Sequence, residues 1–217
     1  MIMRTKQIVK SVLRGAVRSC REYMRMSGGW TVQDQGVESV ICYGIAQSLF
    51  NETRKRDVVM ELPFSWLKEY SLKKIRKGRP RQEFKGKPRA DVVLFNGLGW
   101  ADAVIEVKRW PSYDSIRHDV SRIRAILRDL EKKRDGTVKL GCVVAIRQRR
   151  INSRRWKRTS EVAEKFRVAL SNEFPQLSCQ VKTKGFAIPP QFGRSFARAY
   201  NISGYDAMCF YFTLCSE

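Results

Sequence analysis

The chain has 217 residues, enough for one domain with a filled core, and its 43% hydrophobic content excludes a disordered basic tail. Its 43 lysines and arginines outnumber 21 aspartates and glutamates, so the formal net charge is +22. That excess predicts an anionic partner, and it favours nucleic acid over a membrane because the charge is spread along the whole chain. A merely soluble basic protein is the alternative.

The cysteines and the apolar runs limit the class of protein further. None of the six cysteines forms a C-x-x-C pair and there is one histidine, so the spacing of a zinc site is absent. The chain has neither the apolar core of a signal peptide nor a run of 18 apolar residues. We therefore expect no contact with a membrane and a reducing, intracellular (cytoplasmic) location.

Two helices are predicted first. Residues 5–25 have apolar side chains at helical spacing, and the opposite face carries a stripe of cations. The stripe consists of Lys6, Lys10, Arg14, Arg18, Arg21 and Arg25. It is either a solvated face or a contact for phosphates, and the sequence leaves both open. A second helix begins near Thr31, where Asp34 completes a capping pattern, and continues to Phe50.

A strand, a basic loop and a hairpin follow. Residues 57–64 form the strand, and residues 68–89 form a loop with ten lysines or arginines in 22 positions. The hairpin pairs residues 90–95 with 100–108 through the short turn 96–99.

The second half alternates helices and strands. We expect a helix at 112–134, a strand at 139–146, a second basic run at 147–158, a helix at 160–172 and strands at 177–183 and 207–215. This order indicates an α/β domain with a mixed sheet.

The hairpin contains the residues that point to a reaction. A turn centred between Leu98 and Gly99 places Asp91 directly opposite Glu106, and like charges on paired strands repel each other. A divalent cation such as Mg²⁺ is the usual neutraliser, and Lys108 lies on the same face as Glu106. The alternative is a simple ion pair between Glu106 and Lys108 at the end of a strand.

This set of residues resembles the PD-(D/E)XK nuclease superfamily, which has the restriction-endonuclease-like fold. The acidic residue of the second core strand corresponds to Asp91, and the acidic residue and lysine of the third correspond to Glu106 and Lys108. An acidic residue on the preceding helix often completes the site, and Glu38 matches it. Ala90 stands where the family pattern has proline.

The resemblance implies a nuclease core of α-β-β-β-α-β order over residues 31–148, with a central mixed sheet flanked by helices. A basic amphipathic helix at 1–30 precedes it, and a C-terminal α/β extension at 149–217 packs on it. The implied activity is Mg²⁺-dependent hydrolysis of DNA phosphodiester bonds, for which Mn²⁺ can substitute. Asp91 and Glu106 would hold the metal with Glu38 as third ligand, and Lys108 would be the catalytic cation.

The remaining predictions concern the partner and the neighbouring helix. We expect the basic runs to contact DNA through Lys73, Lys74, Arg76, Lys77, Arg79, Arg81, Arg149, Arg150, Arg154 and Arg155. RNA is not excluded because both polymers present phosphates, and a homodimer would be needed for paired cuts on both strands. His118 and Asp119 are expected on a solvated helix face; the alternative is that Asp119 faces the active site and that His118 is a hydrogen-bond donor behind it. The alternative function is non-catalytic binding of nucleic acid.

Overall fold

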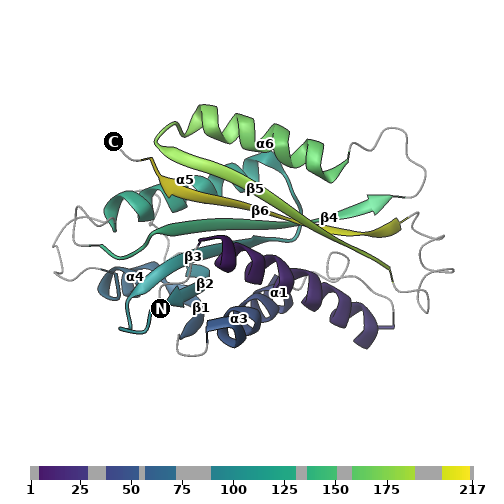
Figure 1. Cartoon of the computed structure of the whole chain (residues 1–217), viewed down its shortest axis with the longest axis horizontal. Helices are drawn as coiled ribbons and strands as arrows, with labels where there is room; N and C mark the ends of the chain where they lie inside the picture. The colour runs from purple at the N-terminus through teal and green to yellow at the C-terminus, as the bar shows by residue number, and fades with distance from the viewer. Residues whose placement is uncertain are drawn as a thin grey trace.

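The protein, seen in a computed structural model, is built around a six-stranded sheet with the order β1-β2-β3-β4-β6-β5 (Figure 1). The structure describes residues 5–28, 38–53, 57–71, 89–130, 136–150, 158–188 and 202–215. The strands are β1 (Val58–Pro63), β2 (Arg89–Phe95), β3 (Ala101–Lys108), β4 (Leu140–Arg150), β5 (Leu177–Ala187) and β6 (Ile202–Leu214). The helices are α1 (Thr5–Met26), α3 (Glu38–Thr53), α4 (Phe64–Glu69), α5 (Tyr113–Asp129) and α6 (Thr159–Glu173).

The sheet is mixed, as the sequence predicts. Strands β3 and β4 are parallel, and every other neighbouring pair is antiparallel. A parallel pair needs a crossover, and α5 provides it. The predicted order of helix, three strands, helix and strand is present from α3 to β4, with the short helix α4 added after β1.

The C-terminal strands belong to the same sheet. Strand β6 pairs with β4 on one side and with β5 on the other. The segment that we expected as an extension packed on the core therefore continues the central sheet. Strand β4 also runs to Arg150, four residues beyond its predicted end, because Arg147 to Arg150 pair with β6 from Asp206 to Ile202.

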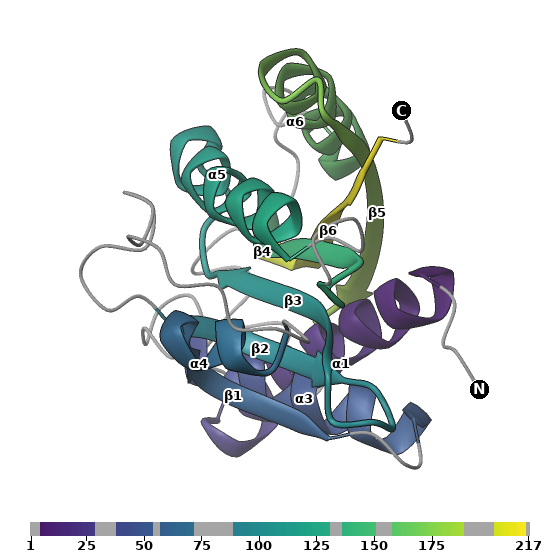
Figure 2. The ribbon, with the colours of Figure 1, turned by 90° about the vertical axis from the view of Figure 1, so that its left-hand side faces the viewer.

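Helices cover both faces of the sheet, which separates two apolar cores (Figure 2). Helices α1 and α3 pack on the face that carries Val92 and Ile105, and α5 and α6 pack on the face that carries Val93 and Val104. This division follows from the alternation of side chains along β2 and β3. Five of the six cysteines are buried and all six are free. No helix within the described ranges is long and apolar enough to cross a membrane.

Helices α1 and α3 approach closely where two glycines face each other. A Cβ atom at Gly15 would lie 2.3 Å from the carbonyl oxygen of Gly44, and one at Gly44 would lie 2.5 Å from the Cβ of Ser19. The absence of both side chains lets the helix backbones meet, which seats the basic helix α1 against the helix that carries Glu38.

We expect Gly15→Ala to lower the free energy of unfolding by about 1–3 kcal/mol, because the new methyl group meets backbone atoms that cannot rotate away. The loss would occur although alanine favours helix formation by about 1 kcal/mol over glycine. Urea unfolding measures it, with the exposed Lys10→Ala on the same helix as control. A Gly15→Ala protein as stable as the wild type would show that the helices can separate at no cost.

Candidate active site

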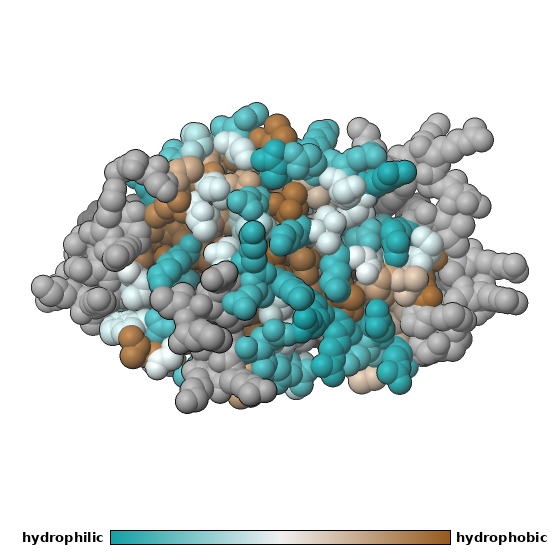
Figure 3. All heavy atoms as spheres, in the orientation of Figure 1, coloured by the Kyte–Doolittle hydropathy of each residue, from teal (hydrophilic) through white to brown (hydrophobic). Residues whose placement is uncertain are grey.

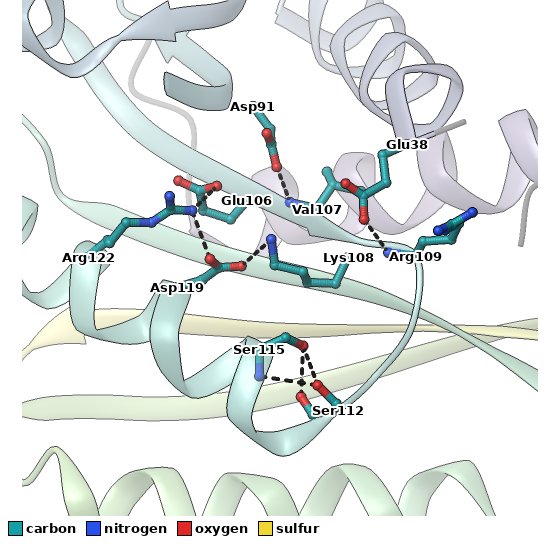
Figure 4. A network of polar contacts seen from close by, with 10 residues as sticks. All are labelled: Glu38, Asp91, Glu106, Val107, Lys108, Arg109, Ser112, Ser115, Asp119 and Arg122. Atoms are coloured by element: carbon teal, nitrogen blue, oxygen red, sulfur yellow. Dashed lines mark hydrogen bonds and ion pairs between the residues drawn. The ribbon is translucent and has the colours of Figure 1, made fainter. Parts of the chain in front are cut away.

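Strands β2 and β3 bring two carboxylates together at the point where their ladder ends. The pairs Val92–Ile105 and Leu94–Ala103 confirm the predicted register up to Val92, and continuing that register by one residue sets Asp91 opposite Glu106. Beyond Val92, the Asp91 Oδ2 atom accepts a hydrogen bond from the backbone N–H of Val107 at 2.6 Å (Figure 4). The side chain of Asp91 thus takes an N–H group that a continued ladder would have used.

Burial makes both carboxylates hard to ionise. Only 1% of the Glu106 side chain is exposed. Burial is the largest cause that raises the pKa of Glu106 well above its ordinary value, and the charge of Asp91 adds to it while Arg122 opposes it. Burial also raises the pKa of Asp91, against the hydrogen bond from Val107. A cation beside these groups would favour their charged forms.

A chain of opposite charges connects Glu106 to Lys108 through helix α5 (Figure 4). One guanidinium nitrogen of Arg122 donates to Glu106 Oε2 at 2.9 Å and to Asp119 Oδ1 at 2.8 Å. The ammonium of Lys108 lies 3.0 Å from Asp119 Oδ2. The side chains of Glu106 and Lys108 on β3 are therefore held by two residues of one helix.

The expectation of a solvated helix face is wrong for Asp119, of which only 1% of the side chain is exposed, whereas His118 is exposed as expected. A signal was present in the sequence, because Asp119 stands three residues after Ile116 and four before Ile123, on the buried stripe of α5. Arg122 follows Asp119 by three residues, a spacing at which side chains meet. The less favoured alternative for Asp119, a position facing the candidate site, is therefore the one observed, whereas Arg122 was not expected there.

Glu38 lies close to the end of β3, as the sequence suggests. It is the first residue of α3, and its Oε1 atom accepts a hydrogen bond from the backbone N–H of Arg109 at 2.9 Å. The buried thiol of Cys42 marks the region where the acids gather. Burial chiefly raises its pKa, and the negative charges of Asp91, Glu61, Glu38 and Glu106 raise it further.

Glu61 is a second acidic neighbour of Asp91. The pairs Met60–Val92 and Leu62–Ala90 on either side set Glu61 opposite Asp91 in the β1–β2 register. Its backbone has φ of +55°, which is uncommon for a residue other than glycine. The charge of Glu61 contributes to the raised pKa of Asp91. Glu61 is thus a neighbour of Asp91, whereas Glu38 lies at the end of β3, on the backbone of Arg109.

The donor set fits a hard cation that keeps part of its water. Glu106 Oε1 is buried and has no hydrogen-bond partner, so one oxygen of the central carboxylate is available. Mg²⁺ is usually bound by one or two carboxylates with several waters. No group of three or more His, Cys, Asp or Glu arranged for a metal was found in the part of the chain that the structure describes. Asp91 and Glu106 offer carboxylate oxygens of the kind that such a cation takes, without an all-protein cage.

The predicted nucleic-acid-binding residues are only partly visible. Eight of them lie outside the described residues: Lys73, Lys74, Arg76, Lys77, Arg79, Arg81, Arg154 and Arg155. The side chain of Arg150 is not described either, and the predicted helix start at Thr31 also lies outside the described residues. Arg149 donates to the carbonyl oxygen of Phe186 at 2.7 Å and lies 3.5 Å from Asp206. Its guanidinium therefore has two partners inside the fold.

The basic end of β4 lies beside the candidate site, because β3 and β4 are parallel and their C-terminal ends lie on the same side of the sheet. Lys108 pairs with Ala145, and β4 continues past it to Arg150. A second basic surface is the stripe on α1, where hydrophilic side chains gather in Figure 3. Arg14 pairs with Glu52 and Arg18 with Glu22, so part of this stripe is neutralised within the fold.

Comparison of the chain with protein-family models, with curated proteins and with solved structures gave no match. The residues of the site and the order of the helices and strands around them are therefore the basis for a proposed function.

Proposed function

We propose that this protein is a Mg²⁺-dependent nuclease of the PD-(D/E)XK type, acting on DNA. The observation that supports it most is the meeting of Asp91 and Glu106 where the β2–β3 ladder ends, with Lys108 two residues beyond Glu106. The helix–strand order from α3 to β4 agrees with the nuclease core that the sequence resembles.

In this proposal each residue has a defined role. Asp91 and Glu106 would hold the metal, with Glu38 or Glu61 as a further acid. The bound cation would polarise the phosphodiester and lower the pKa of an attacking water. The Lys108 ammonium would stabilise negative charge that develops on the phosphate, and removal of such a group typically costs about 10²–10³ in rate. Mn²⁺ is expected to replace Mg²⁺.

The test is a cleavage assay on supercoiled, linear, single-stranded and branched DNA and on RNA, with Mg²⁺, Mn²⁺ or EDTA. We expect cleavage of at least one substrate that depends on the metal, and the preferred substrate would distinguish DNA from RNA. An assay in which no nucleic acid is cut, although the folded protein binds it, would refute the proposal.

One observation favours the alternative, a basic protein that binds nucleic acid without catalysis. Arg122 already offers a positive charge to Glu106, so part of the carboxylate charge is neutralised without any metal. In that case Glu106 would have a structural role only. Variants of Glu106 would then leave nucleic-acid function unchanged, whereas variants of the basic runs would remove it.

If DNA contacts the predicted basic loop at residues 68–89, the loop should contribute to the salt dependence of DNA affinity. Replacing Lys73, Lys74, Arg76 and Lys77 with glutamine should weaken DNA binding and flatten the plot of log affinity against log salt. Each phosphate contact that is lost lowers the steepness of this plot by about 0.9 for duplex DNA. Fluorescence anisotropy over a range of salt concentrations measures this.

The control for the basic loop is Lys182→Gln/Lys184→Gln on β5, at the opposite edge of the sheet from β1. These two exposed lysines test for a general loss of positive charge. If the loop variant keeps the salt dependence of the wild type, the protein contacts phosphates with other residues, for example with the cationic stripe on α1.

A further inference from the structure

Helix α5 buries two charged side chains against β3 where apolar ones would pack at lower cost. Asp119 is almost fully buried, and only 15% of the Arg122 side chain is exposed. Removing charges from water is unfavourable, and a buried ion pair often stabilises a fold no more than apolar residues of the same volume would. The stability of the fold alone therefore does not account for this pair.

The geometry of the pair suggests what it does. Asp119 uses one oxygen for Arg122 and the other for Lys108, and Arg122 in turn holds Glu106. The Lys108 side chain is 24% exposed, and its stem has four rotatable bonds, so an unpaired ammonium would turn toward water. With Asp119 in place, the ammonium stays on the face of β3 that carries Glu106.

The charge balance agrees with this arrangement. The carboxylate of Asp119 lies 3.0 Å from the Lys108 ammonium and 2.8 Å from the Arg122 guanidinium, so it faces two cations at once. With all four groups ionised, Lys108, Asp119, Arg122 and Glu106 carry two charges of each sign. Asp119 thus compensates two cations that Glu106 alone would not balance.

We propose that Asp119 is a positioning residue, which holds the Lys108 ammonium in place beside Glu106, while Arg122 fixes Asp119 and Glu106 relative to each other. This inference rests on the proposed nuclease function. It assigns a role to two residues of α5 that lie outside the Asp91, Glu106 and Lys108 set. A role in catalysis requires that Asp119 acts through Lys108, which can be tested directly.

The test is a double-mutant cycle on the wild type, Asp119→Asn, Lys108→Ala and the double variant, using the substrate that the wild type cleaves. Asparagine keeps the shape of the side chain and removes its charge. We expect Asp119→Asn to lower kcat by about 10–100-fold, the usual effect of losing a supporting partner, with KM and DNA affinity unchanged. In the Lys108→Ala background the same substitution should have no further effect on kcat.

Control variants separate positioning from folding. Asp114→Asn, on the exposed first turn of the same helix, should leave kcat unchanged. The charge-balanced variant Asp119→Asn/Arg122→Gln removes one charge of each sign and serves if the single variant does not fold. It should lose at least as much kcat, since Lys108 again has no partner carboxylate.

The outcomes distinguish a positioning role of Asp119 from a structural one. An Asp119→Asn enzyme with full kcat, or one that loses the same factor with and without Lys108, would overturn the positioning role while leaving the nuclease intact. A loss of folding stability without a loss of kcat would assign Asp119 a structural role only. A folded wild type that cleaves no nucleic acid would overturn the nuclease function and the positioning role together.

Discussion

Glu106→Gln and Asp91→Asn are each expected to lower metal-dependent cleavage by at least about 100-fold, since each removes a charged oxygen donor from the proposed metal site. Neither variant should weaken DNA binding, because fewer carboxylates mean less repulsion toward phosphate. Both substitutions keep the size of the side chain, so the ion-pair chain of α5 and the hydrogen bond from Val107 retain an oxygen acceptor.

The measurements for these variants are initial rates of cleavage and, separately, DNA affinity in EDTA. Asp57→Asn is a suitable control, because Asp57 is an exposed carboxylate just before β1. Full cleavage by Glu106→Gln, from a preparation free of contaminating nuclease, would remove Glu106 from the site. Equal losses in Asp57→Asn would point to a general effect of charge.

The second large effect is expected in stability. Arg122→Leu leaves Glu106 and Asp119 buried without the guanidinium that joins them. Breaking a buried ion pair on one side typically costs about 3–5 kcal/mol, because the remaining charge is uncompensated. We therefore expect the free energy of unfolding in urea to fall by about that amount.

Arg117→Leu is the matched control, on the same helix and also in an ion pair, with Glu173. Its side chain is 53% exposed, and an exposed pair contributes about 0–1 kcal/mol. If both variants lose the same small amount, the charges around Arg122 are better solvated than their burial indicates.

Local patterns were sufficient for most of the elements. The helix predicted at 5–25 is observed as Thr5–Met26, and the helix predicted at 160–172 as Thr159–Glu173. The register from Val92 to Leu94 could also be predicted from the position of the short turn, although the pairing shifts by one residue between Leu94 and Phe95. This register is what places Asp91 opposite Glu106.

Contacts between distant segments could not be predicted in the same way. The position of β6 between β4 and β5 depends on pairing across more than 50 residues, for which the sequence has no local signal. The contact of Gly15 with Gly44 is of the same kind. Helix α4 was missed because Phe64–Glu69 is a single short stretch between a strand and a basic segment.

The part of the candidate site on β2 and β3 could be predicted from the sequence. The contacts of these strands with side chains of α5 could not. Asp91, Glu106 and Lys108 belong to one hairpin, so their relation follows from strand geometry. Asp119 and Arg122 reach the site only because α5 packs over β3 as the crossover helix. The position of Asp119 on the apolar stripe of its helix could have favoured the alternative in which it faces the candidate site.

Binding of Mn²⁺ to the DNA-free protein, measured by electron paramagnetic resonance, tests most directly whether Asp91 and Glu106 hold a metal. We expect one site in the wild type from which excess Mg²⁺ displaces Mn²⁺, and no such site in Asp91→Asn/Glu106→Gln. Glu38→Gln and Glu61→Gln then identify the third acid as the one whose loss weakens binding. Equal Mn²⁺ binding by the wild type and the double variant would contradict the claim that Asp91 and Glu106 share a metal.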